Sequence, residues 1–327
     1  LIKDQYISKS FVGDTQSQVD YYINKACVYF GIFELYEEAI TELNKAIELV
    51  KQNNDYKETL FYAYVQLAQV YIYSGDVTNA KSNISLASDL SNIDDPARII
   101  ASKEVFYFVN SKISLDQDDL ESALKYSDKD IEILKSKKNE IVNDIQAYLI
   151  RNEILLRMNR DQEAFYSIRD LYDKIINIYK EPQTISMAQT LYAKAARKLK
   201  QYDLAKELAI KAKETLKEIY PEGKDYNVVN NHIILGEIYD DLGEYDNADK
   251  EYKMAEESFN SFCTKKEANY IRDIYYNLAL LSVKTARVNQ MKHYFGLLKN
   301  NFGMDNKKTN DLIKYLYDHN LPMPWTK

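Results

Sequence analysis

Residues that commonly catalyse reactions or bind metal ions are few in this sequence and lie far apart. They are three histidines, His232, His293 and His319, and two cysteines, Cys27 and Cys263. Local zinc sites and disulfide frameworks need such residues at short, fixed spacings, which do not occur here. We therefore expect a structural or surface role for His232, which falls in a predicted helix, and we expect Cys27 to be a buried apolar residue. Such sparse cysteine usage also favours a reducing compartment.

Clustered carboxylates are the remaining candidates for metal chemistry, at Asp116, Asp118 and Asp119 and again at Asp240 and Asp241. The first cluster lacks the central glycine and the terminal glutamate of a calcium-binding EF-hand loop. We interpret both clusters as solvated charges near turns. Phosphate-binding glycine loops, His-Glu-x-x-His helices and Gly-x-Ser-x-Gly nucleophile turns do not occur either. The sequence thus predicts a protein that is not an enzyme, with no catalytic residues, no cofactor and no metal site.

Overall charge argues against two broad classes of partner. The 327 residues include 43 Lys and Arg against 50 Asp and Glu, for a formal net charge of -7. Such a chain is poorly suited to nucleic acid or anionic membranes, and it has no apolar stretch of about 18 residues that would span a bilayer. We expect a cytoplasmic location, although a chain that starts at Leu1 is also compatible with a removed targeting segment. The oligomeric state stays open.

An internal repeat decides the expected fold. Glycine and proline are scarce, with 8 and 5 copies, which favours helices joined by short turns over sheets or long linkers. A small residue follows a turn-like stretch at intervals of 41 to 43 residues, and Met291 continues the same frame. The positions are Ala39, Ala80, Ala123, Ala164, Ala205 and Ala248.

Each repeat unit has apolar residues at helical spacing on both sides of its turn. The clearest unit has Leu235 and Gly236 in its first helix, a turn at Gly243 and Ala248 in its second helix. Gly75 and Gly243 permit the positive φ that ends a helix, and the small residues let two antiparallel helices pack closely. Because one such pair cannot bury its own apolar face, neighbouring pairs must stack.

This pattern resembles the tetratricopeptide repeat family, in the long-period variety of about 42 residues seen in kinesin light chains and in bacterial peptide-sensing regulators. The resemblance implies an all-α fold, a right-handed α-solenoid of about seven helix pairs with a C-terminal capping helix. Residues 1–19 are then the tail of a preceding helix or an N-terminal cap, and residues 305–327 are the capping helix and tail, with Trp325 packed against it. The seven repeats run approximately over 20–60, 61–103, 104–144, 145–185, 186–228, 229–271 and 272–304.

In this family the first helices of the pairs line a concave groove that holds peptides or segments of partner proteins. Counting equivalent helix positions in each repeat gives the residues that we expect to line it. Asn277 matches a position where kinesin light chain repeats often carry a groove asparagine. The predicted peptide- or protein-binding residues are Tyr62, Gln69, Tyr73, Arg157, Lys194, Arg197, Lys198, Asn230, Glu237, Asp241, Tyr276 and Asn277.

Opposite charges follow one another in the later repeats, and two interpretations are open. Lys194, Arg197 and Lys198 are basic, while Glu237 and Asp241 in the next repeat are acidic. These groups can pair with each other across the helices. Alternatively, Lys194 and Arg197 can hold a carboxylate or phosphate of a partner peptide.

Arg151 and Asn152 stand where other repeats have Leu-Gly or Leu-Ala. An unpaired buried arginine is costly. Either the helix is rotated so that Arg151 reaches solvent, or a polar joint makes the stack flex at this point.

The leading prediction is a noncatalytic protein–protein interaction module that binds a peptide or protein segment in its groove. The alternative, suggested by the resemblance to bacterial regulators, is the ligand-sensing domain of a transcription regulator whose DNA-binding domain lies outside this fragment. In both cases the expected partner is a protein or peptide, with no direct nucleic-acid binding by this fragment and no membrane.

Overall fold

The computed structural model describes residues 14–33, 35–90, 96–136, 144–263 and 269–324. Every regular element in these ranges is a helix, and the predicted all-α solenoid class is confirmed. Residues 1–19 were expected to be a helix tail or an N-terminal cap, and residues 1–13 of this segment lie outside the described ranges. Trp325 also lies outside them. The predicted repeat boundaries stay a prediction.

The chain forms two compact units, an N-terminal unit that ends at Arg157 and a C-terminal unit that starts at Met158. In the N-terminal unit a short 3₁₀ turn, Asn54–Tyr56, precedes the third helix. The helices of this unit are α2 (Thr15–Gly31), α3 (Tyr36–Val50), α4 (Lys57–Tyr73), α5 (Val77–Asp89), α6 (Pro96–Asp116), α7 (Leu120–Ser136) and α8 (Asp144–Arg157).

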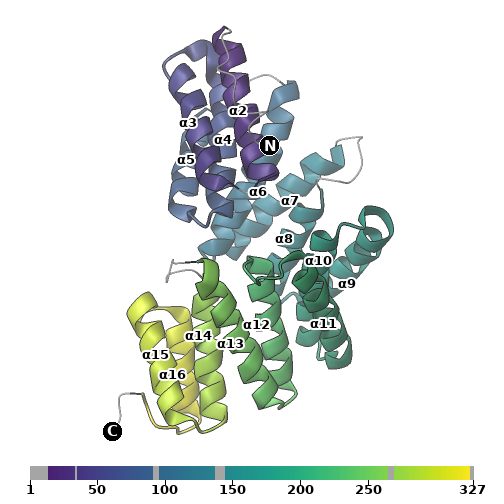
Figure 1. The fold of residues 1–327 in the computed structure, drawn as a ribbon, viewed down its shortest axis with the longest axis vertical. Helices are drawn as coiled ribbons and strands as arrows, with labels where there is room; N and C mark the ends of the chain where they lie inside the picture. The colour runs from purple at the N-terminus through teal and green to yellow at the C-terminus, as the bar shows by residue number, and fades with distance from the viewer. Residues whose placement is uncertain (1–13, 34, 91–95, 137–143, 264–268, 325–327) are drawn as a thin grey trace. The chain divides into compact units, whose positions relative to one another are not determined.

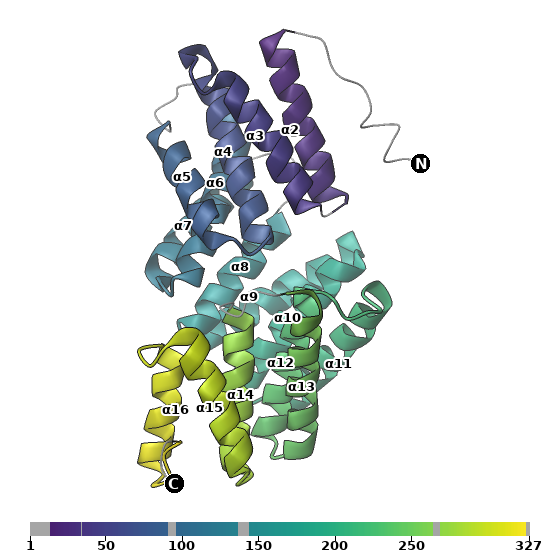
Figure 2. The same cartoon turned by 60° about the vertical axis from the view of Figure 1, so that its left-hand side comes forward.

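Consecutive helices of the N-terminal unit pack in pairs, α2 with α3, α4 with α5 and α6 with α7 (Figures 1 and 2). The small residues of the repeat frame lie at these contacts, because Ala39, Ala80 and Ala123 are fully buried. First helices of neighbouring pairs also touch, since α4 packs on α6 and α6 on α8. The pairs therefore stack through their first helices as well as within each pair.

Local sequence explains where these helices begin and end. The carboxylates of Asp14 and Asp76 cap α2 and α5 by accepting hydrogen bonds from the backbone N–H groups of Ser17 and Asn79. After α4, Gly75 adopts a φ of 78°, a left-handed conformation that costs little without a Cβ atom. The turn that follows brings α5 back against α4.

The C-terminal unit repeats this arrangement. α10 pairs with α11, α12 with α13 and α14 with α15, and α16 packs against α14 and α15 (Figure 1). A five-residue π-helical segment, Ile175–Tyr179, directly follows α9 (Asp161–Lys174). The helices of this unit are α9 (Asp161–Lys174), α10 (Pro182–Lys198), α11 (Tyr202–Ile219), α12 (Tyr226–Asp241), α13 (Tyr245–Phe262), α14 (Asn269–Lys284), α15 (Val288–Phe302) and α16 (Lys307–Asp318).

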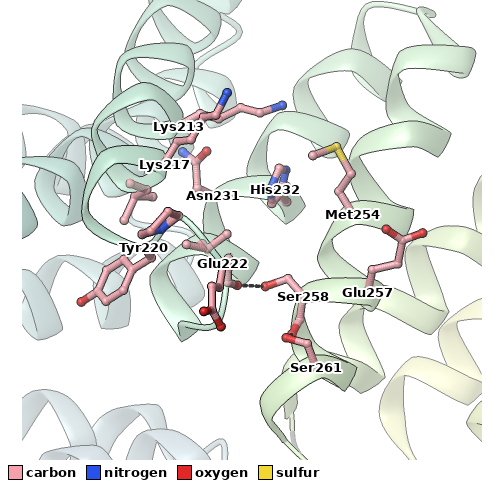
Figure 3. A pocket seen from close by; sticks show the side chains of 14 residues that line it. Lys213, Lys217, Tyr220, Glu222, Asn231, His232, Met254, Glu257, Ser258 and Ser261 are labelled. Carbon is pink, nitrogen blue, oxygen red and sulfur yellow. Dashed lines mark hydrogen bonds between the residues drawn. The ribbon is translucent and has the colours of Figure 1, made fainter.

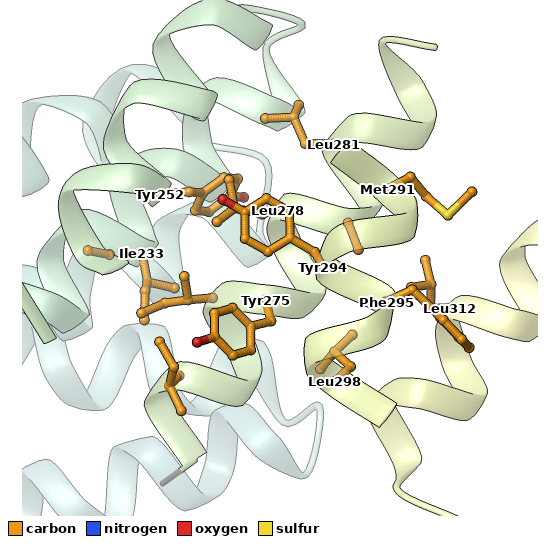
Figure 4. Packing of buried hydrophobic residues seen from close by; sticks show 14 of the residues in the cluster. Ile233, Tyr252, Tyr275, Leu278, Leu281, Met291, Tyr294, Phe295, Leu298 and Leu312 are labelled. Atoms are coloured by element: carbon orange, nitrogen blue, oxygen red, sulfur yellow. The ribbon is translucent and has the colours of Figure 1, made fainter. Parts of the chain in front are cut away.

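The contact between α12 and α13 requires a glycine. A Cβ atom on Gly236 would lie 2.4 Å from Cε1 of Tyr252, and the Tyr252 side chain is fully buried. Tyr252 belongs to the core of the C-terminal unit, where it joins Leu278, Phe295 and Leu312 (Figure 4). The Leu-Gly pair seen in the sequence is thus explained by the close approach of an aromatic ring to the α12 backbone.

Candidate functional site

Most of the predicted binding residues lie in the C-terminal unit, on the first helices of its pairs. α10 packs on α12, and α12 packs on α14. All of these residues except the exposed Asp241 are half-buried. We call them the C-terminal face, which consists of Lys194, Arg197, Lys198, Asn230, Glu237, Asp241, Tyr276 and Asn277.

Arg197 is the central cation of the C-terminal face. Its Nη1 donates to Oε2 of Glu237 at 2.7 Å, and its Nε donates to Oδ2 of Asp241 at 2.9 Å. Burial by itself would lower the pKa of Arg197, but the two neighbouring carboxylates raise it overall. The structure therefore pairs the opposite charges across α10 and α12, as the first of the two interpretations expected.

Other charges of this region are also paired between helices. Nζ of Lys284 on α14 donates to Asp240 on α12 at 2.6 Å, and the Asp240 side chain is only 11% exposed. Nζ of Lys198 donates to Oδ1 of Asn159 at 3.2 Å. The interpretation of Asp240 as a solvated turn charge is therefore wrong, because Lys284 of the next pair covers it.

Tyr276 and Asn277 lie next to each other on α14, but their side chains have different surroundings. Nζ of Lys308 on α16 stands 4.4 Å from the centroid of the Tyr276 ring, a cation–π distance. Burial is the main reason that the pKa of Tyr276 is raised. Nδ2 of Asn277 is buried and has no hydrogen-bond acceptor among the described residues. Asn230 lies half-buried on α12.

In the N-terminal unit the predicted residues Tyr62, Gln69 and Tyr73 lie on α4. The ring of Tyr73 stands 5.2 Å from that of Phe30 and 6.4 Å from that of Phe108, measured between centroids. Tyr73 nevertheless keeps 37% of its surface exposed. We call Phe30, Tyr73 and Phe108 the aromatic row. It runs over the first helices of three successive pairs, α2, α4 and α6.

The other predicted residues of this unit are Tyr62, Gln69 and Arg157. Burial, together with the adjacent Cys27 thiol, raises the pKa of Tyr62 to about 12. Gln69 is half-buried. Arg157, at the end of α8, donates to the Leu115 carbonyl at 3.1 Å and lies 3.4 Å from a carboxylate oxygen of Glu153.

Arg151 reaches partial solvent and is also paired. Its Nε donates to Oδ1 of Asp128 on α7 at 2.8 Å, and its side chain is 23% exposed. The neighbouring Asn152 is fully buried, and its Nδ2 donates to the Tyr148 carbonyl. This geometry agrees with the rotated-helix alternative for Arg151.

The sequence analysis correctly placed Arg197 next to Glu237 and Asp241, but it missed the contacts that Lys284 and Lys308 make with predicted residues and their neighbours. For the ion pairs, the spacing in the sequence would have indicated the partners. Arg197 and Asp241 are 44 positions apart, and so are Asp240 and Lys284. Opposite charges separated by about one repeat therefore predict pairing between successive first helices. Lys308 belongs to the final helix, for which no repeat spacing applies.

The described part of the chain contains no candidate metal site and no candidate membrane-spanning helix. No group of three His, Cys, Asp or Glu side chains there could hold a metal ion. None of the helices in the same ranges is long and apolar enough to cross a membrane.

Comparisons with known proteins agree with this fold. Residues 230–259 match the family model of the tetratricopeptide repeat. NprR in complex with its cognate peptide NprX is 14% identical, with 95% of this chain and 86% of that one covered and a TM-score of 0.72. The apo form of the quorum sensor NprR from B. thuringiensis is 15% identical, with coverages of 94% and 83% and a TM-score of 0.61.

A Rap protein complexed with Competence and Sporulation Factor is 15% identical, with 97% of this chain and 83% of that one covered and a TM-score of 0.67. At these identities the likeness shows the fold alone. A comparison with curated proteins finds no matching sequence. Residues 230–259 thus match a tetratricopeptide repeat, and the described helices share the fold of these solved structures.

Proposed function

We propose that this chain is a noncatalytic interaction module, which binds a peptide or protein segment along the first helices of its pairs. The observation that carries the proposal is the aromatic row, where Tyr73 contacts two rings and still keeps 37% of its surface exposed. Large rings held in place but open to solvent are typical of binding surfaces. The fold shared with NprR, solved with its cognate peptide, supports the same function.

The aromatic row would bind the apolar side chains of the partner. Tyr73 lies at the end of α4, where Phe30 and Phe108 hold its ring on two sides. An immobilised ring loses little conformational entropy when a ligand covers it. The exposed part of Tyr73 can therefore contribute apolar contact area at small cost.

The C-terminal face would donate hydrogen bonds to the backbone of a segment bound on that unit. Nδ2 of Asn277 has no acceptor among the described residues, and an unsatisfied buried donor costs about 1–3 kcal/mol. A backbone carbonyl of a bound segment would satisfy it after a small side-chain rotation. Arg197 is already held by Glu237 and Asp241, so an acidic ligand would have to exchange with these carboxylates. The twelve residues predicted from the sequence remain the proposed lining.

The test is selection of random peptides on the full chain, followed by calorimetry with the selected peptides. Tyr73→Ala and Asn277→Ala should each weaken binding, by about tenfold or more for Tyr73 as an aromatic hot spot. Tyr166→Ala is the matched control, because Tyr166 is 53% exposed on α9, a helix that carries none of the predicted binding residues. Equal affinity of all three variants, or no selected peptide at all, would contradict the proposal.

A second candidate function is the ligand-sensing domain of a transcription regulator. It is favoured by the extent of the likeness to the quorum sensor NprR, which covers 94% of this chain. The reading frame upstream of Leu1 tests it. A helix-turn-helix domain encoded there would support this function, and an upstream sequence without a DNA-binding domain would count against it.

A further inference from the structure

A pocket of about 370 Å³ opens in the C-terminal unit between α11, α12 and α13 (Figure 3). Its apolar lining includes Leu216 from α11, Val228 from α12 and Met254 from α13. At 3.6 residues per turn, the pocket residue His232 points from α12 roughly opposite to Asp241 of the C-terminal face. The pocket is therefore a site separate from the proposed binding face.

His232 lines this pocket, and its ring forms a hydrogen bond through Nδ1. Nδ1 bonds to Oε2 of Glu251 at 2.6 Å, and the other oxygen of Glu251 accepts from Nζ of Lys213 at 2.7 Å. The side chains of His232 and Glu251 are each 8% exposed. The bond to Glu251 is made through Nδ1, so Nε2 is the ring nitrogen that remains to contact a ligand in the pocket.

A second buried polar group lines the same pocket. Asn231 is 1% exposed, and its Nδ2 donates to Oγ1 of Thr190 and to the Ala209 carbonyl. Those two acceptors fix the orientation of the amide. Oδ1 of Asn231 accepts no hydrogen bond within the described residues. The pocket lining thus includes an amide oxygen without a hydrogen-bond donor among the described residues, on the residue that precedes His232.

Charges around the pocket are distributed unevenly. Lys213 is neutralised by Glu251, whereas Lys217, one turn further along α11, is exposed and has no ion-pair partner in the described part of the chain. Glu257 on α13 stands on the other side of His232 (Figure 3), and Glu222 in the loop is held by Lys224 at 2.7 Å. One accessible cation, Lys217, favours a ligand with a single negative charge. A second negative charge on the ligand would be repelled by Glu257.

We propose that this pocket binds an apolar carboxylate. The carboxylate lies between Lys217 and Nε2 of His232. The apolar body packs on Leu216, Val228 and Met254, and an N–H group next to the carboxylate donates to Asn231. A volume of about 370 Å³ suits a ligand of the size of one acylated amino acid. The same chemistry is found in a small free acid and in the C-terminal residue of a polypeptide.

The probe is N-acetylleucine, titrated into the full chain by calorimetry, with the neutral N-acetylleucinamide as its matched partner. We expect the acid to bind at least about tenfold more tightly than the amide, because charge-assisted hydrogen bonds to the carboxylate are lost in the amide. Lys217→Gln should remove most of this preference. Lys211→Gln is the control on the same helix, since Lys211 is exposed and bonded to Glu207 away from the pocket.

The role of His232 is tested by substitution. His232→Gln should weaken the binding of N-acetylleucine, because Nε2 of the ring no longer contacts the carboxylate. Circular dichroism checks that this variant folds.

Ligands of different length distinguish the two sources of the carboxylate. A longer acetylated peptide that ends in leucine and binds about tenfold more tightly than N-acetylleucine indicates a polypeptide C-terminus, and equal affinity indicates a small acid. Equal binding of acid and amide, or unchanged affinity in Lys217→Gln, would overturn the proposal. Because Lys217 is exposed on the surface, that variant keeps the test valid even if His232→Gln does not fold. Peptide binding at the aromatic row is measured separately and does not depend on this result.

Discussion

The first helices of the two units present different chemistry on the same architecture. In the N-terminal unit, Tyr73 contacts both Phe30 and Phe108 in the aromatic row. In the C-terminal unit, the corresponding contacts between α10, α12 and α14 are ion pairs, in which Arg197 and Lys284 hold acidic residues of α12. Both sets of contacts join one helix pair to the next.

The two kinds of contact leave different amounts of side-chain surface exposed. Aromatic contacts leave the Tyr73 ring partly exposed and available to a ligand. Ion pairs consume the groups that would otherwise attract a charged ligand, as Arg197 illustrates with its two carboxylates. We therefore expect the N-terminal unit to contribute apolar affinity, and the paired charges of the C-terminal unit to contribute mainly to stability.

The largest effect is expected where α12 and α13 pack most closely at Gly236. Gly236→Ala places a Cβ atom 2.4 Å from the buried Tyr252 ring and should lower the free energy of unfolding by about 1–3 kcal/mol through overpacking. Hydrogen exchange across residues 226–262 measures the loss. The matched control is Gly296→Ala on α15, where no atom lies within 4 Å of the new Cβ. It should be neutral or stabilising by up to about 1 kcal/mol, and an equal loss in both variants would contradict the packing argument.

Removal of Arg197 tests whether ion pairs stabilise the C-terminal unit. Arg197→Ala leaves Glu237 and Asp241 without their shared cation and should cost about 1–2 kcal/mol of unfolding free energy. Arg157→Ala in the N-terminal unit, where the nearest carboxylate oxygen lies 3.4 Å away, should cost less than about 1 kcal/mol. Urea denaturation at low and high salt measures both, and salt should reduce the difference. Identical losses would remove the distinction between the two units.

Two glutamates of α13 should give opposite responses to pH. Burial would raise the pKa of Glu251, but the hydrogen bonds from His232 and Lys213 lower it below its ordinary value of 4.5. Its contribution to stability is therefore complete above pH 4.5 and is lost as the pH falls through the lowered pKa of the folded state. Urea denaturation of Glu251→Gln across this acid range should show that this loss has disappeared.

Glu256 provides the internal control, because burial raises its pKa above 4.5. The Glu256 side chain stabilises the folded state at pH values below the pKa that it has in the unfolded chain. This contribution is lost as the pH rises through its higher pKa in the folded state. Glu256→Gln should therefore not show this loss of stability with rising pH. Urea denaturation measures the pH dependence of stability in both variants. If Glu251→Gln and Glu256→Gln change this dependence in the same direction relative to the wild-type chain, the two opposite pKa shifts are contradicted.

The smallest effect is expected at Arg151. Its ion pair with Asp128 is partly exposed, with side-chain exposures of 23% and 52%, and such pairs contribute about 0–1 kcal/mol. Arg151→Ala should change the unfolding free energy by no more than this amount. Asp128→Ala is the matched control and should give a similar value. A loss of several kcal/mol in Arg151→Ala would mean that Arg151 holds α7 and α8 together more strongly than its exposure indicates.

Much of the fold was predictable because the repeat frame is a local signal. Ala39, Ala80 and Ala248 are buried where the frame places them, and Gly75 and Gly243 adopt positive φ at the predicted turns. The candidate site was only partly predictable. The spacing of Arg197 and Asp241 indicated that they were neighbours, whereas nothing in the helical period predicted that Lys308 of α16 would lie over Tyr276.

The sequence by itself determined the helices, their turns and the positions of the small residues, because these depend on residue types a few places apart. Tertiary structure decided which polar groups are occupied and which are left open. Glu251 is shared by Lys213 and His232, and the aromatic row draws one ring from each of three helices. Such contacts join residues of different helices, and they depend on how those helices pack against one another, which no local pattern specifies.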